Sequence, residues 1–166
     1  MQEVNLMPHQ SQALARLEAS GGRQLLNLCP GAGKTLTAIE YVRDMKHVLI
    51  VCPASILGVW EAECAKWDAT VPFKVQGTPK EREGVLAEMQ ARGGWYVIGY
   101  EMFRKEVKRL AHVKWDIVLS DECHRLKSPT SRVSKLFRKF AEGVPKVVLL
   151  SGSTPINSWM DMWPQV

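Results

Sequence analysis

The stretch LLNLCPGAGKT, residues 25–35, decides the fold. Its first half is an apolar run of strand length, and a glycine-containing turn that ends in Gly-Lys-Thr follows it. A helical pattern comes next, with Leu36, Ile39 and Val42 on one face. A strand, a turn and a helix in this order form the setting in which a phosphate-binding loop works.

The turn carries the residue types that phosphate binding requires. Its glycines let backbone N–H groups face phosphate oxygens, and the helix N-terminus adds a partial positive charge. Lys34 is expected to reach the β and γ phosphates, and Thr35 to ligate Mg²⁺. Leu28 stands where the pattern G-x-x-x-x-G-K-[ST] has its first glycine, so the loop alone leaves a chance surface turn as an alternative.

The rest of the chain alternates between strand and helix patterns. Short continuous apolar runs predict strands that are covered on both faces. These runs lie at 47–52, 73–75, 95–100, 115–120 and 146–150, and helical patterns lie at 8–20, 36–42, 55–67, 79–89, 103–110 and 131–141. Ser55 is expected to cap the third helix. The alternation predicts an α/β domain with a mainly parallel, doubly wound sheet, whose ligands bind beyond the carboxyl ends of the strands.

An acidic pair follows one of these strands. Asp121 is expected to hold Mg²⁺ through its water shell, and Glu122 to orient or deprotonate the water that attacks the nucleotide. The alternative is that the pair only caps the next turn. His124 fits a polar link to a neighbouring motif better than a metal ligand.

Charge is unevenly distributed along the chain. The formal net charge is +5, and between Glu101 and Lys146 there are 12 basic and 6 acidic residues. Basic charge gathered in one part of a chain favours a polyanionic partner, with a solvated lysine-rich face as the alternative.

Composition places the chain among ordinary globular domains. It has 166 residues, 46% hydrophobic and 23% charged, which predicts one domain with a real core. We expect no signal peptide and no membrane span. The four cysteines have no C-x-x-C spacing, so we expect no zinc site, buried reduced thiols and a cytoplasmic location; they are Cys29, Cys52, Cys64 and Cys123.

At this point the chain resembles the superfamily two nucleic-acid translocases, and their Swi/Snf-related branch in particular. The matching segments are residues 6–10, 30–35, 51–57 with Trp60 and Trp67, 100–102, 121–128 and 150–157. The first four residues of segment 121–128, DECH, are similar to a DEAH-type box. The resemblance implies a three-layer RecA-like P-loop NTPase domain that uses ATP and Mg²⁺ and contacts DNA.

The resemblance also implies roles for individual residues. Nucleotide contacts are expected from Gln10, which would touch adenine, and from Gly31, Ala32, Gly33, Lys34 and Thr35. Lys34 and Glu122 would be catalytic, while Thr35 and Asp121 would hold the metal. DNA backbone contacts are expected from Pro53, Ala54, Ser55, Tyr100 and Lys127, with main-chain N–H groups and hydroxyls as donors. Hydrolysis would be coupled to DNA contact by His124, Ser151 and Thr154.

Three departures from the family pattern bear on these roles. Cys123 replaces the usual alanine, and Ser153 interrupts the usual Gly-Thr-Pro sequence of the coupling motif. The family works with two lobes, and the chain is expected to be a single N-terminal lobe over residues 1–166 without the second. Because arginine fingers contribute about 10³–10⁵ in rate, we expect slow hydrolysis by this lobe alone.

Two other functions remain as alternatives. One is a stand-alone, non-catalytic module that holds nucleic acid or a protein partner with its basic face. The other is an unrelated phosphate-loop enzyme such as a small kinase, which the later motifs disfavour. A second helicase lobe, in cis or in trans, is the partner expected under the leading hypothesis.

Overall fold

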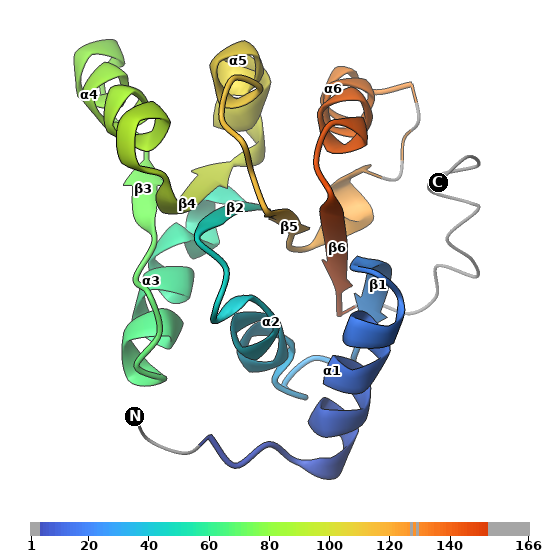
Figure 1. Ribbon diagram of the computed structural model, residues 1–166. Helices are drawn as coiled ribbons and strands as arrows, with labels where there is room; N and C mark the ends of the chain where they lie inside the picture. The colour runs from blue at the N-terminus through green and yellow to red at the C-terminus, as the bar shows by residue number, and fades with distance from the viewer. Residues whose placement is uncertain (1–3, 127, 129, 153–166) are drawn as a thin grey trace.

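Six parallel strands form the centre of the computed structural model, which describes residues 4–126, 128 and 130–152 (Figure 1). The strands are β1 (Arg23–Asn27), β2 (His47–Cys52), β3 (Phe73–Val75), β4 (Gly94–Gly99), β5 (Ile117–Ser120) and β6 (Lys146–Ser151). Their spatial order is β1-β6-β5-β2-β4-β3, and every pair is parallel. The predicted mainly parallel α/β fold is confirmed.

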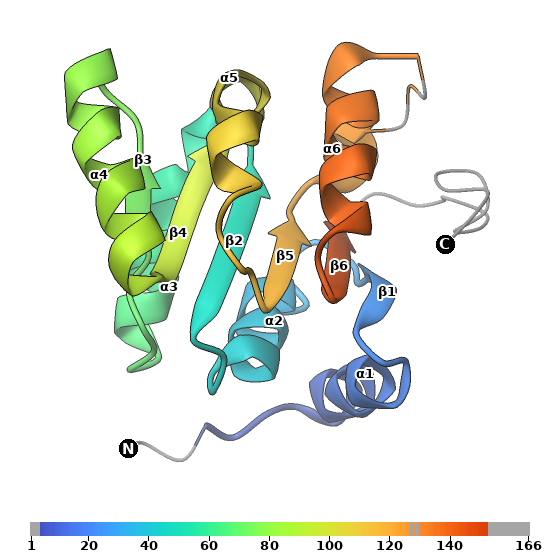
Figure 2. The ribbon, with the colours of Figure 1, turned by 45° about the horizontal axis from the view of Figure 1, so that its top comes forward.

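Helices cover both faces of the sheet (Figure 1 and Figure 2). They are α1 (Pro8–Ala19), α2 (Lys34–Val42), α3 (Leu57–Lys66), α4 (Pro79–Arg92), α5 (Tyr100–Leu110) and α6 (Arg132–Glu142). Alternate strand residues face alternate layers: Leu49 and Val51 pack with α4, α5 and α6, and Val48 and Ile50 pack with α1, α2 and α3. Because both faces are covered, the strands are continuously apolar, as in other parallel sheets.

The start of α3 differs from the sequence prediction. Ser55 does not cap the helix, because a short 3₁₀ turn over Ala54–Ile56 intervenes after Pro53. This turn puts Ile56 at the N-cap position, without a side-chain cap, and leaves Ser55 exposed. The predicted helix therefore exists but begins at Leu57.

The cysteines follow the prediction at three of four positions. Cys52, Cys64 and Cys123 are buried, and burial raises the pKa of the Cys52 and Cys64 thiols to about 12. Cys29 is exposed, because it lies in the turn between β1 and α2 rather than inside a layer. The expectation that all four thiols are buried is therefore wrong at Cys29. Among the described residues, no helix has the length and apolar character needed to cross a membrane.

Strand order decides which motifs meet. Strand β6 lies between β1 and β5, so its carboxyl end separates the glycine-rich turn from the acidic pair. Strands β2 and β4 are neighbours, in register from His47 opposite Gly94 to Cys52 opposite Gly99. The residues that follow β2 and β4 consequently lie beside one another at the same edge of the sheet.

Candidate nucleotide-binding site

The glycine-rich turn has the backbone of a phosphate cradle. Gly31 and Gly33 have positive φ angles of 78° and 76°, which favour glycine. Gly33 is the N-cap of α2, and no side chain caps this helix, so its first N–H groups have no side-chain partner. Leu28 donates its N–H to the Ser151 carbonyl (3.3 Å), continuing the pairing of β1 with β6. The missing first glycine is therefore accommodated as an extension of the strand.

Lys34 lies inside this turn. Its Nζ donates to the Leu28 carbonyl at 3.1 Å, so the ammonium group sits over the concave side of the loop. A Cβ added at Gly152 would lie 2.9 Å from that nitrogen, which places the end of β6 directly against Lys34. Thr35 follows on the first turn of α2 and lines the same cleft.

Gln10 braces the turn from α1. Its Oε1 accepts from the Met7 N–H (2.8 Å), and its Nε2 donates to the Ala32 carbonyl (3.3 Å). The His9 Nε2 lies 3.0 Å from the same carbonyl oxygen. A Cβ at Gly33 would come within 2.0 Å of the Gln10 Nε2, so a larger residue would displace this amide, and the positive φ of Gly33 favours glycine as well. Gln10 is buried, with both ends of its side chain engaged by backbone.

Asp121 is a buried carboxylate held from two sides. Its Oδ2 accepts from the Trp60 indole N–H (3.1 Å), and its Oδ1 accepts from the Glu122 N–H (2.8 Å). Burial raises the pKa of Asp121, against the lowering effect of these two hydrogen bonds and of the Lys34 charge. The side chain is therefore oriented toward the phosphate loop, and its ionisation is costly without a nearby cation.

Glu122 follows in an unusual backbone conformation. Its φ is 51°, which is uncommon for a residue that carries a side chain. The Glu122 Oε2 lies 3.1 Å from the His124 Nδ1, and both side chains are partly exposed. His124 was predicted to link the acidic pair to a neighbouring motif. The contact with Glu122 provides one end of that link.

These groups line one cleft of about 620 Å³. The turn from Gly31 to Thr35 forms one side, Asp121 and Glu122 form another, and His9 and Gln10 lie at the α1 end. Residues from α3 and its C-terminal end complete the lining, namely Val59, Glu63, Lys66 and Trp67. The cleft therefore brings together every described residue predicted to contact nucleotide or metal.

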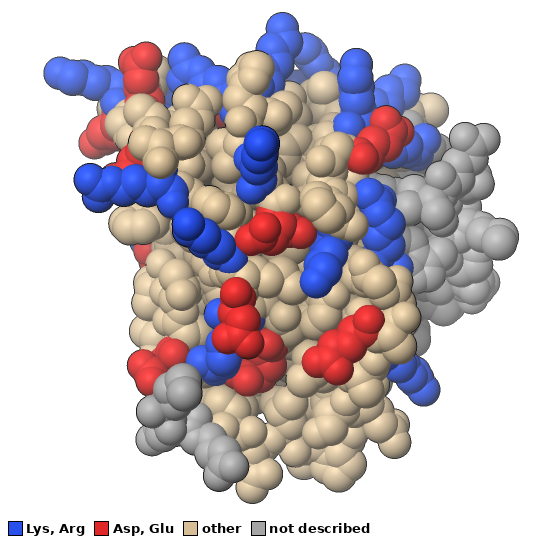
Figure 3. Space-filling view, in the orientation of Figure 1, with Lys and Arg blue, Asp and Glu red and all other residues tan. Residues whose placement is uncertain are grey.

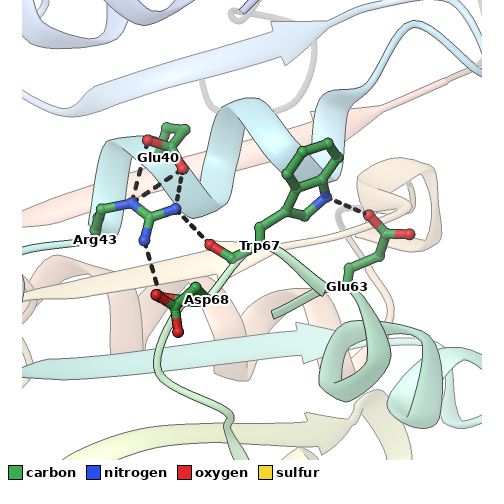
Figure 4. Close-up of polar contacts among 5 residues, drawn as sticks. All are labelled: Glu40, Arg43, Glu63, Trp67 and Asp68. Carbon is green, nitrogen blue, oxygen red and sulfur yellow. Dashed lines mark hydrogen bonds and ion pairs between the residues drawn. The ribbon is translucent and has the colours of Figure 1, made fainter. Parts of the chain in front are cut away.

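The α3 side of the cleft is fastened to α2 by a polar cluster (Figure 4). The Arg43 guanidinium pairs with Glu40 and donates to the carbonyls of Trp67 (2.9 Å) and Asp68 (3.1 Å). The Trp67 indole N–H donates to Glu63 (3.0 Å), which fixes the ring beside the cleft. Because Arg43 ends α2, the helix that begins at the phosphate loop is anchored at both ends.

The residues predicted to contact DNA form a second group. Pro53 and Ala54 meet Gly99 and Tyr100 around a pocket of about 300 Å³, where a Cβ at Gly99 would lie 3.3 Å from the Ala54 Cβ. Tyr100 is buried, and its hydroxyl lies 2.7 Å from both the Ser120 Oγ and the Asp121 carbonyl oxygen. The expectation that this hydroxyl is offered to DNA is therefore wrong; it braces the acidic motif instead.

Some functional positions were missed or cannot be placed. Arg125 lines the same pocket as Pro53 and Tyr100, and only its membership in the basic extension of the acidic motif signalled it. The Trp60 contact with Asp121 was not predicted, since the spacing of Trp60 indicated only a core position. Ser151 ends β6 and is buried, whereas Lys127 and Thr154 lie outside the described residues.

Together the parallel sheet, the phosphate loop and the acidic pair define a P-loop NTPase domain of RecA-like architecture. The family model of the SNF2-related domain matches residues 14–165, and the chain belongs to this family. The zebrafish (Danio rerio) protein "DNA excision repair protein ERCC-6-like" is 31% identical over 80% of the chain. The yeast (Saccharomyces cerevisiae) "Transcription regulatory protein SNF2" is also 31% identical over 80% of it.

These relatives are much longer than this chain. The match covers 10% of the zebrafish protein and 8% of the yeast protein. Among solved structures, the Sulfolobus solfataricus SWI2/SNF2 ATPase core in complex with dsDNA superposes with a TM-score of 0.81 and 24% identity. That alignment covers 96% of this chain and 34% of the other, and it establishes the likeness of the fold.

Proposed function

We propose that this chain is the ATP-binding lobe of a DNA-dependent ATPase of the translocase type. The observation that carries the proposal is the shared cleft, in which the phosphate loop and the Asp121–Glu122 pair face one another across the end of β6. Membership in the SNF2-related family supports the same reading.

The residues of the cleft fit a nucleotide chelated to Mg²⁺. The uncapped N-terminus of α2 and the Lys34 ammonium offer donors for phosphate oxygens. Across the described residues, no three His, Cys, Asp or Glu side chains are arranged to hold a metal ion by themselves. Thr35 and Asp121 would therefore bind Mg²⁺ together with phosphate oxygens of the nucleotide. Mg²⁺ sites in proteins commonly combine one or two side chains with substrate phosphates in this way.

Each protein group then has a distinct task. Lys34 would exchange its contact with the Leu28 carbonyl for phosphate oxygens, and the buried carboxylate of Asp121 would be a ligand of the cation. Glu122 orients the attacking water, with His124 holding its carboxylate from the other side. Bound Mg²⁺ supplies charge neutralisation for phosphoryl transfer. Gln10 keeps the turn in place and lies where it could also meet a base at the α1 end of the cleft.

Efficient turnover is proposed to need a second lobe. Within the described residues, the lining of the cleft includes Lys34 and Lys66 but no arginine. Phosphoryl transfer in related reactions gains about 10³–10⁵ in rate from an arginine finger. We therefore assign residues 1–166 to a first lobe that binds ATP and turns it over slowly by itself.

DNA is proposed to lie along the ends of β2 and β4. Pro53, Ala54 and Tyr100 meet there, with the exposed Arg125 beside them, and Ser55 follows in the 3₁₀ turn. Backbone N–H groups and basic side chains bind phosphates without reading sequence, so affinity should fall steeply between about 50 and 200 mM salt. Lys127 would add to this contact, and Ser151 and Thr154 would couple it to the cleft.

The test combines nucleotide binding with turnover. A fluorescent ATP analogue is titrated with Mg²⁺ into the wild type, Lys34→Ala and the control Lys46→Ala, whose side chain is exposed elsewhere. Lys34→Ala should weaken binding by at least about tenfold, because a charged phosphate contact is lost. Undiminished binding would overturn the nucleotide assignment. Turnover by the pure chain at about 1 s⁻¹ or faster, an ordinary enzymatic rate, would contradict the proposal that a second lobe is needed.

A further inference from the structure

An apolar groove of about 340 Å³ lies between the C-terminal halves of α5 and α6. Its apolar lining comes from Val107, Ala111, Val113, Leu136, Phe140 and Val144. Trp115, which precedes β5, also lines it, so the groove lies at the amino edge of the sheet. The nucleotide cleft lies at the carboxyl edge, and the two sites share no residue.

The groove is bordered by positive charge from both helices. Lys108 of α5 and Lys139 of α6 line it directly. Arg104 and Lys135 stand four residues earlier on the same helical faces. Helices α5 and α6 together carry eight basic and three acidic residues, a balance equal to the +5 of the whole chain.

The acidic residues of these helices do little to offset this charge. Glu106 is buried and paired with Arg82 and Arg109, and Glu101 is paired with Arg104. Among the described residues, neither of the two lysines that line the groove, Lys108 and Lys139, forms an ion pair. In Figure 3 the Lys and Arg side chains gather over the part of the molecule that α4, α5 and α6 occupy in Figure 1. Lys108 and Lys139 also offset the partial negative charge of the helix C-termini.

We propose that this groove docks an acidic amphipathic helix of a partner protein. An apolar floor between two helices suits the apolar face of a third helix, and basic borders suit acidic residues flanking that face. Helices α5 and α6 have 11 residues each, a length of about 16 Å. A partner helix of about three turns would therefore match the length of α5 and α6, and about half of it would lie on the groove between their C-terminal halves.

A nucleic acid fits the groove less well than a peptide does. Phosphate binding draws on backbone N–H groups and helix N-termini, but the groove presents the C-terminal ends of α5 and α6. The side chains that line it between the two lysines are apolar. The docking function is independent of nucleotide binding, because no residue of the cleft takes part in it.

The test measures binding of a defined peptide to the full chain. The probe is a fluorescein-labelled peptide of about 14 residues, with leucines at helical spacing on one face and glutamates on the other. Ala111→Trp fills the groove from an exposed position, and the pair Lys108→Glu and Lys139→Glu reverses its borders. Arg16→Glu, at an exposed position of α1 in the opposite helix layer, is the matched charge control.

Both groove variants should weaken peptide binding by at least about tenfold, and the control by less than about twofold. A peptide of the same composition in scrambled order should bind at least about tenfold more weakly. Circular dichroism and unchanged ATP affinity verify that each variant is folded. If Ala111→Trp does not fold, the double variant of Lys108 and Lys139 alone tests the proposal. Equal binding of the scrambled peptide, or full binding by the groove variants, overturns the proposal. The proposal is also overturned if the groove variants lose as much affinity for a DNA duplex of about 20 base pairs as for the peptide.

Discussion

The two helix layers differ in what they contribute to the nucleotide cleft. In the α4–α6 layer, Phe103 packs with Phe137 and Phe140 at ring-centroid distances of 5.6 and 5.3 Å. In the α1–α3 layer, directed hydrogen bonds are added to apolar packing, as between Trp60 and Asp121. All described residues of the nucleotide cleft that come from helices belong to α1, α2 or α3.

The helices that line the nucleotide cleft are therefore not the helices that carry the excess of basic side chains. The α1–α3 layer aims its side chains at the carboxyl edge, where the phosphate loop and the acidic pair lie. The α4–α6 layer packs on the sheet mainly through apolar and aromatic side chains, with two hydrogen bonds that join the Tyr100 hydroxyl to Ser120 and Asp121, and α5 and α6 together carry eight basic side chains. Substitutions in the two layers should accordingly change different properties.

The largest expected effect is on stability, from Phe103→Ala. Phe103 is completely buried at the centre of the aromatic cluster, so its truncation should cost about 3–5 kcal/mol of unfolding free energy. Denaturant unfolding measures this cost, with Phe73→Ala, at an exposed position, as the control. ATP affinity of the folded protein should not change. A matching loss of affinity would mean that the two layers are coupled.

The next effect compares two buried tryptophans of the same layer. Trp60 donates to Asp121, whereas Trp95 donates to the Met45 carbonyl (2.9 Å) away from the cleft. Trp60→Phe and Trp95→Phe should both destabilise the fold through lost packing and a lost hydrogen bond. Only Trp60→Phe should weaken Mg²⁺-dependent ATP binding, by about 1.5–3 kcal/mol, because a bond to a charged group is removed.

Equal ATP affinities in these two variants would contradict the role assigned to Trp60. Each variant replaces a nearly inaccessible indole with a phenyl ring, so both should lose similar unfolding free energy. Denaturant unfolding of both variants therefore separates a general loss of stability from a specific loss of ATP affinity.

A smaller effect is the pH dependence of the cleft. Because burial raises the pKa of Asp121, its carboxyl stays protonated at pH values where an exposed aspartate is ionised. As the pH rises through this raised pKa, ionisation lowers the stability of the free protein. As the pH falls through it, Mg²⁺-dependent ATP affinity should weaken. Titrations from about pH 4 upward measure this, and Asp121→Asn should lose the dependence.

The smallest change concerns thiol reactivity. Cys29 is exposed, whereas Cys52, Cys64 and Cys123 are buried, so one thiol should react rapidly with an alkylating reagent. ATP with Mg²⁺ should slow this reaction, because Cys29 lies at the start of the phosphate loop. Mass spectrometry of the labelled chain identifies the site, and Cys29→Ser should remove the rapid phase. An unchanged rate with saturating ATP would place the nucleotide elsewhere.

Much of the fold could be predicted because its signals are local. The face of Leu36, Ile39 and Val42 is buried as its spacing predicts, and the continuous apolar runs became parallel strands. Ser55 failed as a cap because the 3₁₀ turn after Pro53 depends on packing against the end of β4, which the local sequence does not encode.

The residues that form the site could be predicted from the sequence, but the hydrogen bonds that hold them in place could not. Residues such as Lys34, Asp121 and Glu122 carry recognisable chemistry, and the strand ends bring them to one cleft. The buried position of the Tyr100 hydroxyl depends on contact between α5 and β5, and the hydrogen bond from the Trp60 indole depends on contact between α3 and the end of β5. Such contacts join residues 20 and 61 positions apart, beyond the reach of periodicity.

The position of β6 gives the cleft a mechanical property. Its last residue accepts the Leu28 N–H, and Gly152 lies against Lys34, while its other side is paired with β5, which Asp121 follows. A displacement of this one strand end along the sheet would alter the phosphate and carboxylate halves of the cleft in a single movement. Force applied to the chain just after β6 would thus reach both halves at once.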